Sequence, residues 1–168
     1  MHEVELIIKR ALVQFHQDMV QRKWKGRERE AVSHFVTGHL INCVSKDSIF
    51  RDLSQAVIEG AVKQWDKVGK KQVNKDLLIW PDSGMTTWNS VWEPEHVPLA
   101  ILEWKVHRQK NRFKAFHQHD VEWLEWWTTE NTGTLGVLVA LDISTAKPEL
   151  YAGLVKGGLC DKDWLLLK

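Results

Sequence analysis

The sequence of 168 residues predicts a single domain of the mixed α/β class, in which helices cover the faces of a β-sheet. Three observations predict it. The first 44 residues have apolar side chains at helical spacing, three later runs are continuously apolar, and a helical segment lies between the last two runs. A strand–helix–strand order predicts two parallel neighbouring strands, with the helix across one face of the sheet.

Two helices are expected at the N-terminus. The spacing of apolar residues predicts a helix over 3–24, which Gly26 ends or bends, and a second helix over 27–44. In the second helix the apolar side chains form one stripe: Ala31, Val32, Phe35, Val36 and Leu40. Glu28 falls in the middle of this stripe and Glu30 falls on the opposite face. A carboxylate on a buried face needs a partner, so Glu28 is the residue to explain.

The segment 55–80 is compatible with two structures. It either continues a helix from about residue 47 or forms a β-hairpin that turns at 66–69 and ends at Trp80. Gly60 and the β-branched residues around it disfavour a helix, so we expect the hairpin. A loop rich in proline, glycine, asparagine and serine follows over 81–98.

The remaining elements follow from apolar runs and their stop signals. We expect a strand over 98–106, a helix over 112–129 ended by Gly133, and a buried strand over 135–143. The tail after residue 148 carries two short apolar pieces separated by a glycine pair. The chain shows no internal repeat or linker.

Composition excludes several classes of protein. The 43% apolar and 27% charged residues are typical of a globular protein, and 23 basic against 22 acidic residues give no overall charge that would attract nucleic acid. Two cysteines cannot form a disulfide framework. The N-terminus lacks the pattern of a signal peptide, and no apolar run approaches the roughly 20 residues that span a bilayer, so a cytoplasmic protein without membrane contact is expected.

Ten tryptophans are the oddity of the composition. Most are expected to fill the core, because an indole ring buries a large apolar area. Trp88 and Trp92 lie in the loop rich in turn residues and are expected to be exposed.

The triplet Glu103-Trp104-Lys105 ends an apolar run and carries the strongest functional signal. Residues two apart in a strand share a face, so Glu103 and Lys105 point the same way. An acid and a base inside an apolar strand are costly without partners. Asp76 opens the preceding apolar run, and a divalent metal ion shared by Asp76 and Glu103 would be such a partner. This pattern favours metal-assisted hydrolysis.

The run Asp76-Leu77-Leu78-Ile79, followed after a loop by Ala100 to Lys105, resembles the PD-(D/E)xK nuclease superfamily. The resemblance covers about residues 27–143 and includes the order of elements. It implies a restriction-endonuclease-like mixed sheet with an αβββαβ core, here extended by an extra N-terminal helix and a C-terminal extension.

The resemblance also implies roles for individual residues. Asp76 and Glu103 would bind one or two Mg²⁺ or Mn²⁺ ions, and the backbone carbonyl of Trp104 would be a further ligand. Lys105 would position or help to deprotonate the attacking water. Glu28 matches the glutamate that members often carry on the first core helix.

Other acids are weaker candidates. Glu30 is the alternative to Glu28, and Glu59 on the first expected strand is weaker still. Asp82 follows Pro81 in the literal order of the family's name, but Pro-Asp before serine and glycine is ordinary turn chemistry. The histidines in 117–120 are expected to be solvated or to cap the helix.

Basic residues next to the expected site suggest a nucleic-acid partner, most plainly DNA. One run follows the Glu-x-Lys strand and comprises Arg108, Lys110, Arg112 and Lys114. Two further runs lie near Glu28 and before Asp76, the latter ending at Lys75. Because many double-strand cutters of the family pair two domains, a homodimer is compatible with this function. The alternatives are an inactive member of the same fold that binds nucleic acid or protein, and an α/β interaction protein with a tryptophan surface.

Overall fold

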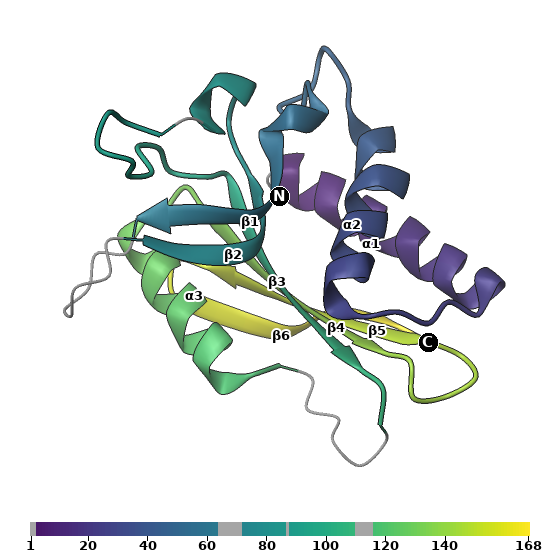
Figure 1. The fold of residues 1–168 in the computed structure, drawn as a ribbon. Helices are drawn as coiled ribbons and strands as arrows, with labels where there is room; N and C mark the ends of the chain where they lie inside the picture. Colours follow the sequence, from purple (N-terminus) through teal and green to yellow (C-terminus); the bar gives the residue numbers. More distant parts are fainter. Residues whose placement is uncertain (1–2, 64–71, 87, 110–115) are drawn as a thin grey trace.

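The computed structural model describes residues 3–63, 72–86, 88–109 and 116–168. The described chain forms helices and strands in the following order: α1 (Glu3–Arg22), α2 (Glu28–Gly38), β1 (Ala56–Lys63), β2 (Gln72–Ile79), β3 (Ala100–His107), α3 (Gln118–Glu130), β4 (Leu135–Asp142), β5 (Glu149–Lys156) and β6 (Leu159–Leu167). Figure 1 shows their arrangement around one sheet. Within the described ranges, no helix combines the length and the apolar character needed to cross a membrane.

The sheet has six strands in the order β1-β2-β3-β4-β5-β6. Strands β3 and β4, which α3 connects, run parallel, and the other neighbouring pairs are antiparallel. The prediction of a mixed α/β sheet is therefore confirmed. The two antiparallel strands of the hairpin expected within 55–80 are also confirmed, as β1 and β2, while the turn expected at 66–69 lies outside the described residues. The tail forms a second hairpin, β5–β6, where the sequence indicated only two apolar pieces.

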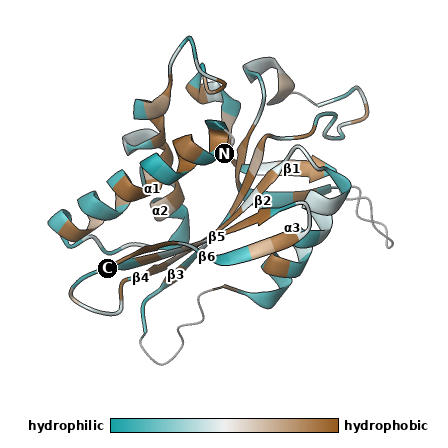
Figure 2. Ribbon diagram, turned by 180° about the vertical axis from the view of Figure 1, so that it is seen from behind, coloured by the Kyte–Doolittle hydropathy of each residue, from teal (hydrophilic) through white to brown (hydrophobic). Residues whose placement is uncertain are grey.

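Helices cover both faces of the sheet (Figures 1 and 2). On one face α1 and α2 pack over a core that includes Phe15, Phe35, Leu102 and Trp104. On the other face α3 packs over a smaller core that includes Leu78, Ile101, Leu124 and Trp127. The alternation of Ile101, Leu102 and Trp104 between the two cores is that of a strand buried on both sides.

Two helices are shorter than expected. The second helix ends at Gly38, not at residue 44, because glycine is a poor helix former, and a 3-10 turn follows over Leu40–Cys43. The crossover helix begins at Gln118, and the part of it expected over 112–115 lies outside the described residues. Phe116 lies before its first turn and packs against Gly153, so this side chain contributes to the core from outside the helix.

Among the described tryptophans, which exclude Trp65, the division between core and loop is as expected. Trp104 and Trp127 are fully buried. Trp88 and Trp92, in the loop before β3, are 42% and 78% exposed.

The side chains of β1 and β2 exchange faces between the pairs Ile58–Leu77 and Gly60–Lys75, where Glu59 and Asp76 are left out of the pairing. On one side of this point Leu77 faces the α1–α2 core and Leu78 faces the α3 core. Simple alternation would send Lys75 to the same face as Leu77, but its ammonium lies over the ring of Trp123 in α3. Glu59 adopts a left-handed φ of 53°, which is uncommon for a residue with a side chain. The hairpin consequently bends away from the other strands (Figure 1).

Candidate active site

Asp76 lies where strands β2 and β3 separate. Their ladder runs from Ile79–Ala100 to Leu77–Leu102. Continued in this register, it would place Asp76 opposite Glu103 and then Lys75 opposite Trp104, the next pair whose backbone groups would hydrogen-bond across the gap. Instead the carboxylate of Asp76 accepts the backbone N–H of Trp104 at 2.7 Å. The change of face within β2 therefore gives the N–H of Trp104 a carboxylate as its acceptor, in place of a backbone carbonyl of β2. This carboxylate lies directly beside the Glu-Trp-Lys triplet.

The same geometry orients the backbone carbonyl of Trp104. The N–H and C=O of one residue in a strand point to the same edge. Since the N–H of Trp104 points toward β2, its C=O points toward the same gap, beyond the last pair of the β2–β3 ladder. A neutral oxygen and a carboxylate thus face the same opening.

Glu103 is buried on the opposite face from Trp104 and is paired with Lys75. The ammonium of Lys75 donates to Oε1 of Glu103 at 2.5 Å and lies 3.5 Å from the ring centre of Trp123. Burial raises the pKa of Glu103 to about 7, Lys75 opposes this shift, and Asp76 and Asp120 add to it. The carboxylate therefore retains a proton at a pH where an exposed glutamate has lost its own.

Lys105 lies between two acids from the two helices nearest to it. Its Nζ is 3.6 Å from Glu28, at the start of α2, and 3.7 Å from Asp120, in the first turn of α3. Burial lowers the pKa of Lys105, but the negative charges of Glu28, Asp120 and Asp76 outweigh it and raise the pKa above its ordinary value. The ammonium is thus held charged between the two layers of helices.

Glu28 borders an open pocket of about 440 Å³. Arg27, Glu59 and Asp76 also line it. Burial raises the pKa of Glu28, Lys105 opposes the rise, and Asp76 adds to it. The pocket gives solvent, and a ligand of moderate size, access to the acids between α2 and β2.

The other sequence candidates do not join the group formed by Asp76, Glu103, Lys105, Glu28, Asp120 and Lys75, although Glu30 and Glu59 line the pocket beside it. The carboxylate of Glu30 accepts the N–H of Arg27 at the start of α2, and Glu59 pairs with Arg29 on the surface. Asp82 accepts the N–H of Gly84 within a turn.

The basic runs are only partly described. Arg108 is exposed just after β3, whereas the remaining three residues of its run lie outside the described residues: Lys110, Arg112 and Lys114. The inclusion of Lys75 in a solvent-facing basic track is wrong, because the turn in β2 buries it against Glu103.

Two members of the cluster were missed by sequence reasoning. Lys75 was missed because strand alternation places it on the other face. Asp120 was missed because the sequence assigns it no role, although an acid in the first turn of the helix after a Glu-x-Lys strand is a usable signal.

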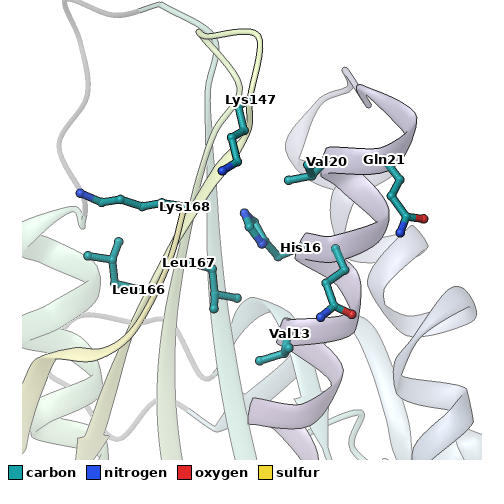
Figure 3. A pocket seen from close by; sticks show the side chains of 9 residues that line it. Val13, His16, Val20, Gln21, Lys147, Leu166, Leu167 and Lys168 are labelled. Carbon is teal, nitrogen blue, oxygen red and sulfur yellow. The ribbon is translucent and has the colours of Figure 1, made fainter.

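A second pocket, of about 480 Å³, lies away from this cluster, between α1 and the end of β6 (Figure 3). Val13, Val20 and Leu167 form its apolar wall, and His16 and Lys147 approach it. The residues that line it include no Asp or Glu side chain, so it offers no carboxylate chemistry of the kind found beside β3.

The chain was compared with known protein families, with curated proteins and with solved structures, and none of the three comparisons gave a match.

Proposed function

We propose that the protein is a Mg²⁺- or Mn²⁺-dependent nuclease with a restriction-endonuclease-like core formed by α2, β1, β2, β3, α3 and β4. The observation that carries this proposal is the bond from the N–H of Trp104 to Asp76, because it fixes a carboxylate beside Glu103 and Lys105. Asp76 comes from β2 and Glu103 from β3, and the pairing of these two strands brings the two acids close together.

The donors suit a hard divalent cation. Carboxylate and carbonyl oxygens are the ligands that Mg²⁺ and Mn²⁺ prefer. Asp76 and Glu103 each use one carboxylate oxygen in a hydrogen bond, to Trp104 and to Lys75, so each has a second oxygen to offer. The carbonyl of Trp104 is the neutral third donor. A bound ion would supply Lewis acidity, which lowers the pKa of water and offsets charge on a phosphate.

Lys105 is the residue suited to the reacting phosphate. An ammonium is a compact cation with three donors, and here Glu28 and Asp120 hold it from two sides. Its raised pKa keeps it charged at neutral pH. It can therefore orient water or stabilise charge that grows on phosphate oxygens in the transition state. Glu28 and Asp120 act through Lys105 as positioning residues.

The proposed substrate is DNA. Arg27 and Arg29 flank Glu28 at the pocket that opens on Asp76, and Arg108 is exposed at the far end of β3. The guanidinium groups of these arginines can form hydrogen bonds and ion pairs with the phosphates of a DNA backbone.

The test is an incubation of the protein with plasmid and single-stranded DNA in Mg²⁺, Mn²⁺ or EDTA. We expect cleavage that requires the metal and is lost in Glu103→Gln. Asp82→Asn is the matched control, because this acid lies in a turn outside the cluster, and it should cleave like the wild type. Metal-dependent cleavage of equal rate in Glu103→Gln would overturn the proposal.

An inactive binding module is the second candidate, and the Lys75–Glu103 pair favours it. A buried ammonium bonded to Glu103 already supplies the positive charge that a metal ion would bring. If this pair is permanent, the protein will bind DNA without cleaving it in any metal, and Glu103→Gln will leave the binding unchanged.

A further inference from the structure

Three potential metal ligands meet between helices α1 and α2. Asp18 comes from α1, His34 from α2, and His39 follows the end of α2. Nε2 of His34 is 2.8 Å and Nε2 of His39 is 3.6 Å from the same oxygen, Oδ2 of Asp18. Among the described residues this is the single set of three or more Asp, Glu, His or Cys side chains whose ligand atoms lie within 4.8 Å of one another.

The end of α2 brings the two histidines together. Residues five apart in a continuous helix are about 140° apart around its axis, so their side chains diverge. The helix ends at Gly38, and His39 has φ −129° and ψ −49°, outside the helical region. Its ring turns back, and the two imidazole centres lie 5.3 Å apart.

Nε2 of His39 faces Oδ2 of Asp18 at 3.6 Å, which is longer than a hydrogen bond. The residue is 9% exposed, and its Nε2 is buried without a hydrogen-bond partner among the described residues. The ring packs edge-on against Phe15, which is fully buried, so the apolar floor of the cluster offers no donor or acceptor. Buried polar atoms are rarely left in this state unless an ion or a water completes them. An ion between Nε2 of His39 and Oδ2 of Asp18 would bridge the two atoms, which lie too far apart for a hydrogen bond.

We infer that Asp18, His34 and His39 form a binding site for one Zn²⁺ ion or a similar transition metal. Two imidazoles and one carboxylate are a donor set for such ions rather than for Mg²⁺. Tetrahedral Zn²⁺ holds its ligand atoms about 3.4 Å from one another, given metal–ligand distances near 2.1 Å. The His39–Asp18 separation of 3.6 Å already fits, and the His34–Asp18 hydrogen bond has to lengthen.

The surroundings allow the ion to enter and to keep a fourth ligand. The side chain of His34 is 31% exposed, so water can reach the open position of the ion beside it. Arg22 donates to the other oxygen of Asp18, Oδ1, and therefore leaves Oδ2 for the metal. The ion would join α1 to α2. This role is structural and does not depend on the proposed nuclease activity.

The site is tested with Zn²⁺ itself on the whole purified chain, stripped with EDTA and then freed of chelator. Calorimetric titration should give one tight Zn²⁺ per chain, and free Zn²⁺ at about 100 times Kd should raise Tm by roughly 5–10 °C. Co²⁺ should give the visible absorption of a four-coordinate ion. Addition of Mg²⁺ at millimolar concentration should not displace either metal.

Variants assign the bound metal to this cluster. His34→Gln and Asp18→Asn should lose at least tenfold in Zn²⁺ affinity and lose the Tm rise, while the exposed His119→Gln on α3 binds like the wild type. His34 is partly exposed, so its replacement should not prevent folding, which circular dichroism will verify. Glu103→Gln should keep the Zn²⁺ site, which separates it from the candidate active site. Equal Zn²⁺ affinity in the wild type, His34→Gln and Asp18→Asn, or no Zn²⁺ binding by the folded wild type, would overturn the inference.

Discussion

The carboxylate of Asp76 accepts the backbone N–H of Trp104 at 2.7 Å, in the position that the next rung of the β2–β3 ladder would occupy. A side chain thus replaces the backbone at the point where the two strands separate. The consequence is an opening in the sheet that a carboxylate and a backbone carbonyl both face, with Glu103 and Lys105 immediately on either side of Trp104.

Replacement of Lys105 by alanine should lower the rate of metal-dependent DNA cleavage. Its ammonium is the charge held by Glu28 and Asp120, and loss of one well-placed electrostatic group typically costs about 10²–10³-fold in rate. Single-turnover cleavage measures the effect, and circular dichroism checks the fold. Lys156→Ala, an exposed lysine at the end of β5, is the control and should be unaffected. A Lys105→Ala protein that cleaves at the wild-type rate would remove this residue from the mechanism.

Replacement of Lys75 by methionine should destabilise the folded state. The change leaves the buried carboxylate of Glu103 without its cation, and breaking a buried pair in this way costs roughly 3–5 kcal/mol. Adding Glu103→Gln should recover most of the loss, because no charge then remains. Urea unfolding of the two single variants and the double variant at pH 8 gives the coupling energy. If the two effects simply add, the pair is not coupled as the structure indicates.

The pKa of Glu103 predicts how stability depends on pH in EDTA. The folded-state pKa is raised from 4.5 to about 7, so between these values the folded chain keeps a proton that the unfolded chain has released. Stability therefore decreases as pH rises through this window, with a slope of up to about 1.4 kcal/mol per pH unit from this group.

The comparison of wild type with Glu103→Gln isolates this contribution. Groups with a lowered pKa, such as Asp18, lose their contribution as pH falls and act in the opposite direction at lower pH. Unfolding free energies should be measured for both proteins from pH 4.5 to 7.5. The difference between the two proteins should change with pH across this range and level off at the acidic end, where Glu103 is protonated. Parallel profiles over the whole range would show that Glu103 has an ordinary pKa.

Gly60 should not tolerate a side chain. A Cβ at this position would lie 2.6 Å from Cδ1 of Leu78, directly beside the residue where β1 and β2 turn over. Gly60→Ala is expected to lower the free energy of unfolding by about 1–3 kcal/mol through overpacking. Gly133→Ala is the matched control, because its Cβ would meet no atom within 4 Å. Equal stability of the two variants would contradict the close approach at Gly60.

Apolar patterning was sufficient to predict most of the sheet. Gly60 and the β-branched residues identified the first hairpin, and the run before Asp142 identified β4. The placement of Lys75 could not be predicted, because strict alternation assigns it to the wrong face and the turn at Asp76 depends on tertiary packing. The close approach of His34 and His39 could not be predicted from the sequence either, because it requires helix α2 to end at Gly38.

The central claim is that Asp76 and Glu103 share a divalent ion, and a crystal of the protein soaked in Mn²⁺ tests it most directly. Anomalous scattering locates Mn²⁺ without reference to activity. We predict a peak bonded to a carboxylate oxygen of both residues and to the carbonyl of Trp104, at metal–oxygen distances of roughly 2.0–2.6 Å, with Lys75 displaced from Glu103. A structure in which Glu103 keeps its bond to Lys75 and no Mn²⁺ peak lies beside Asp76 would contradict the claim.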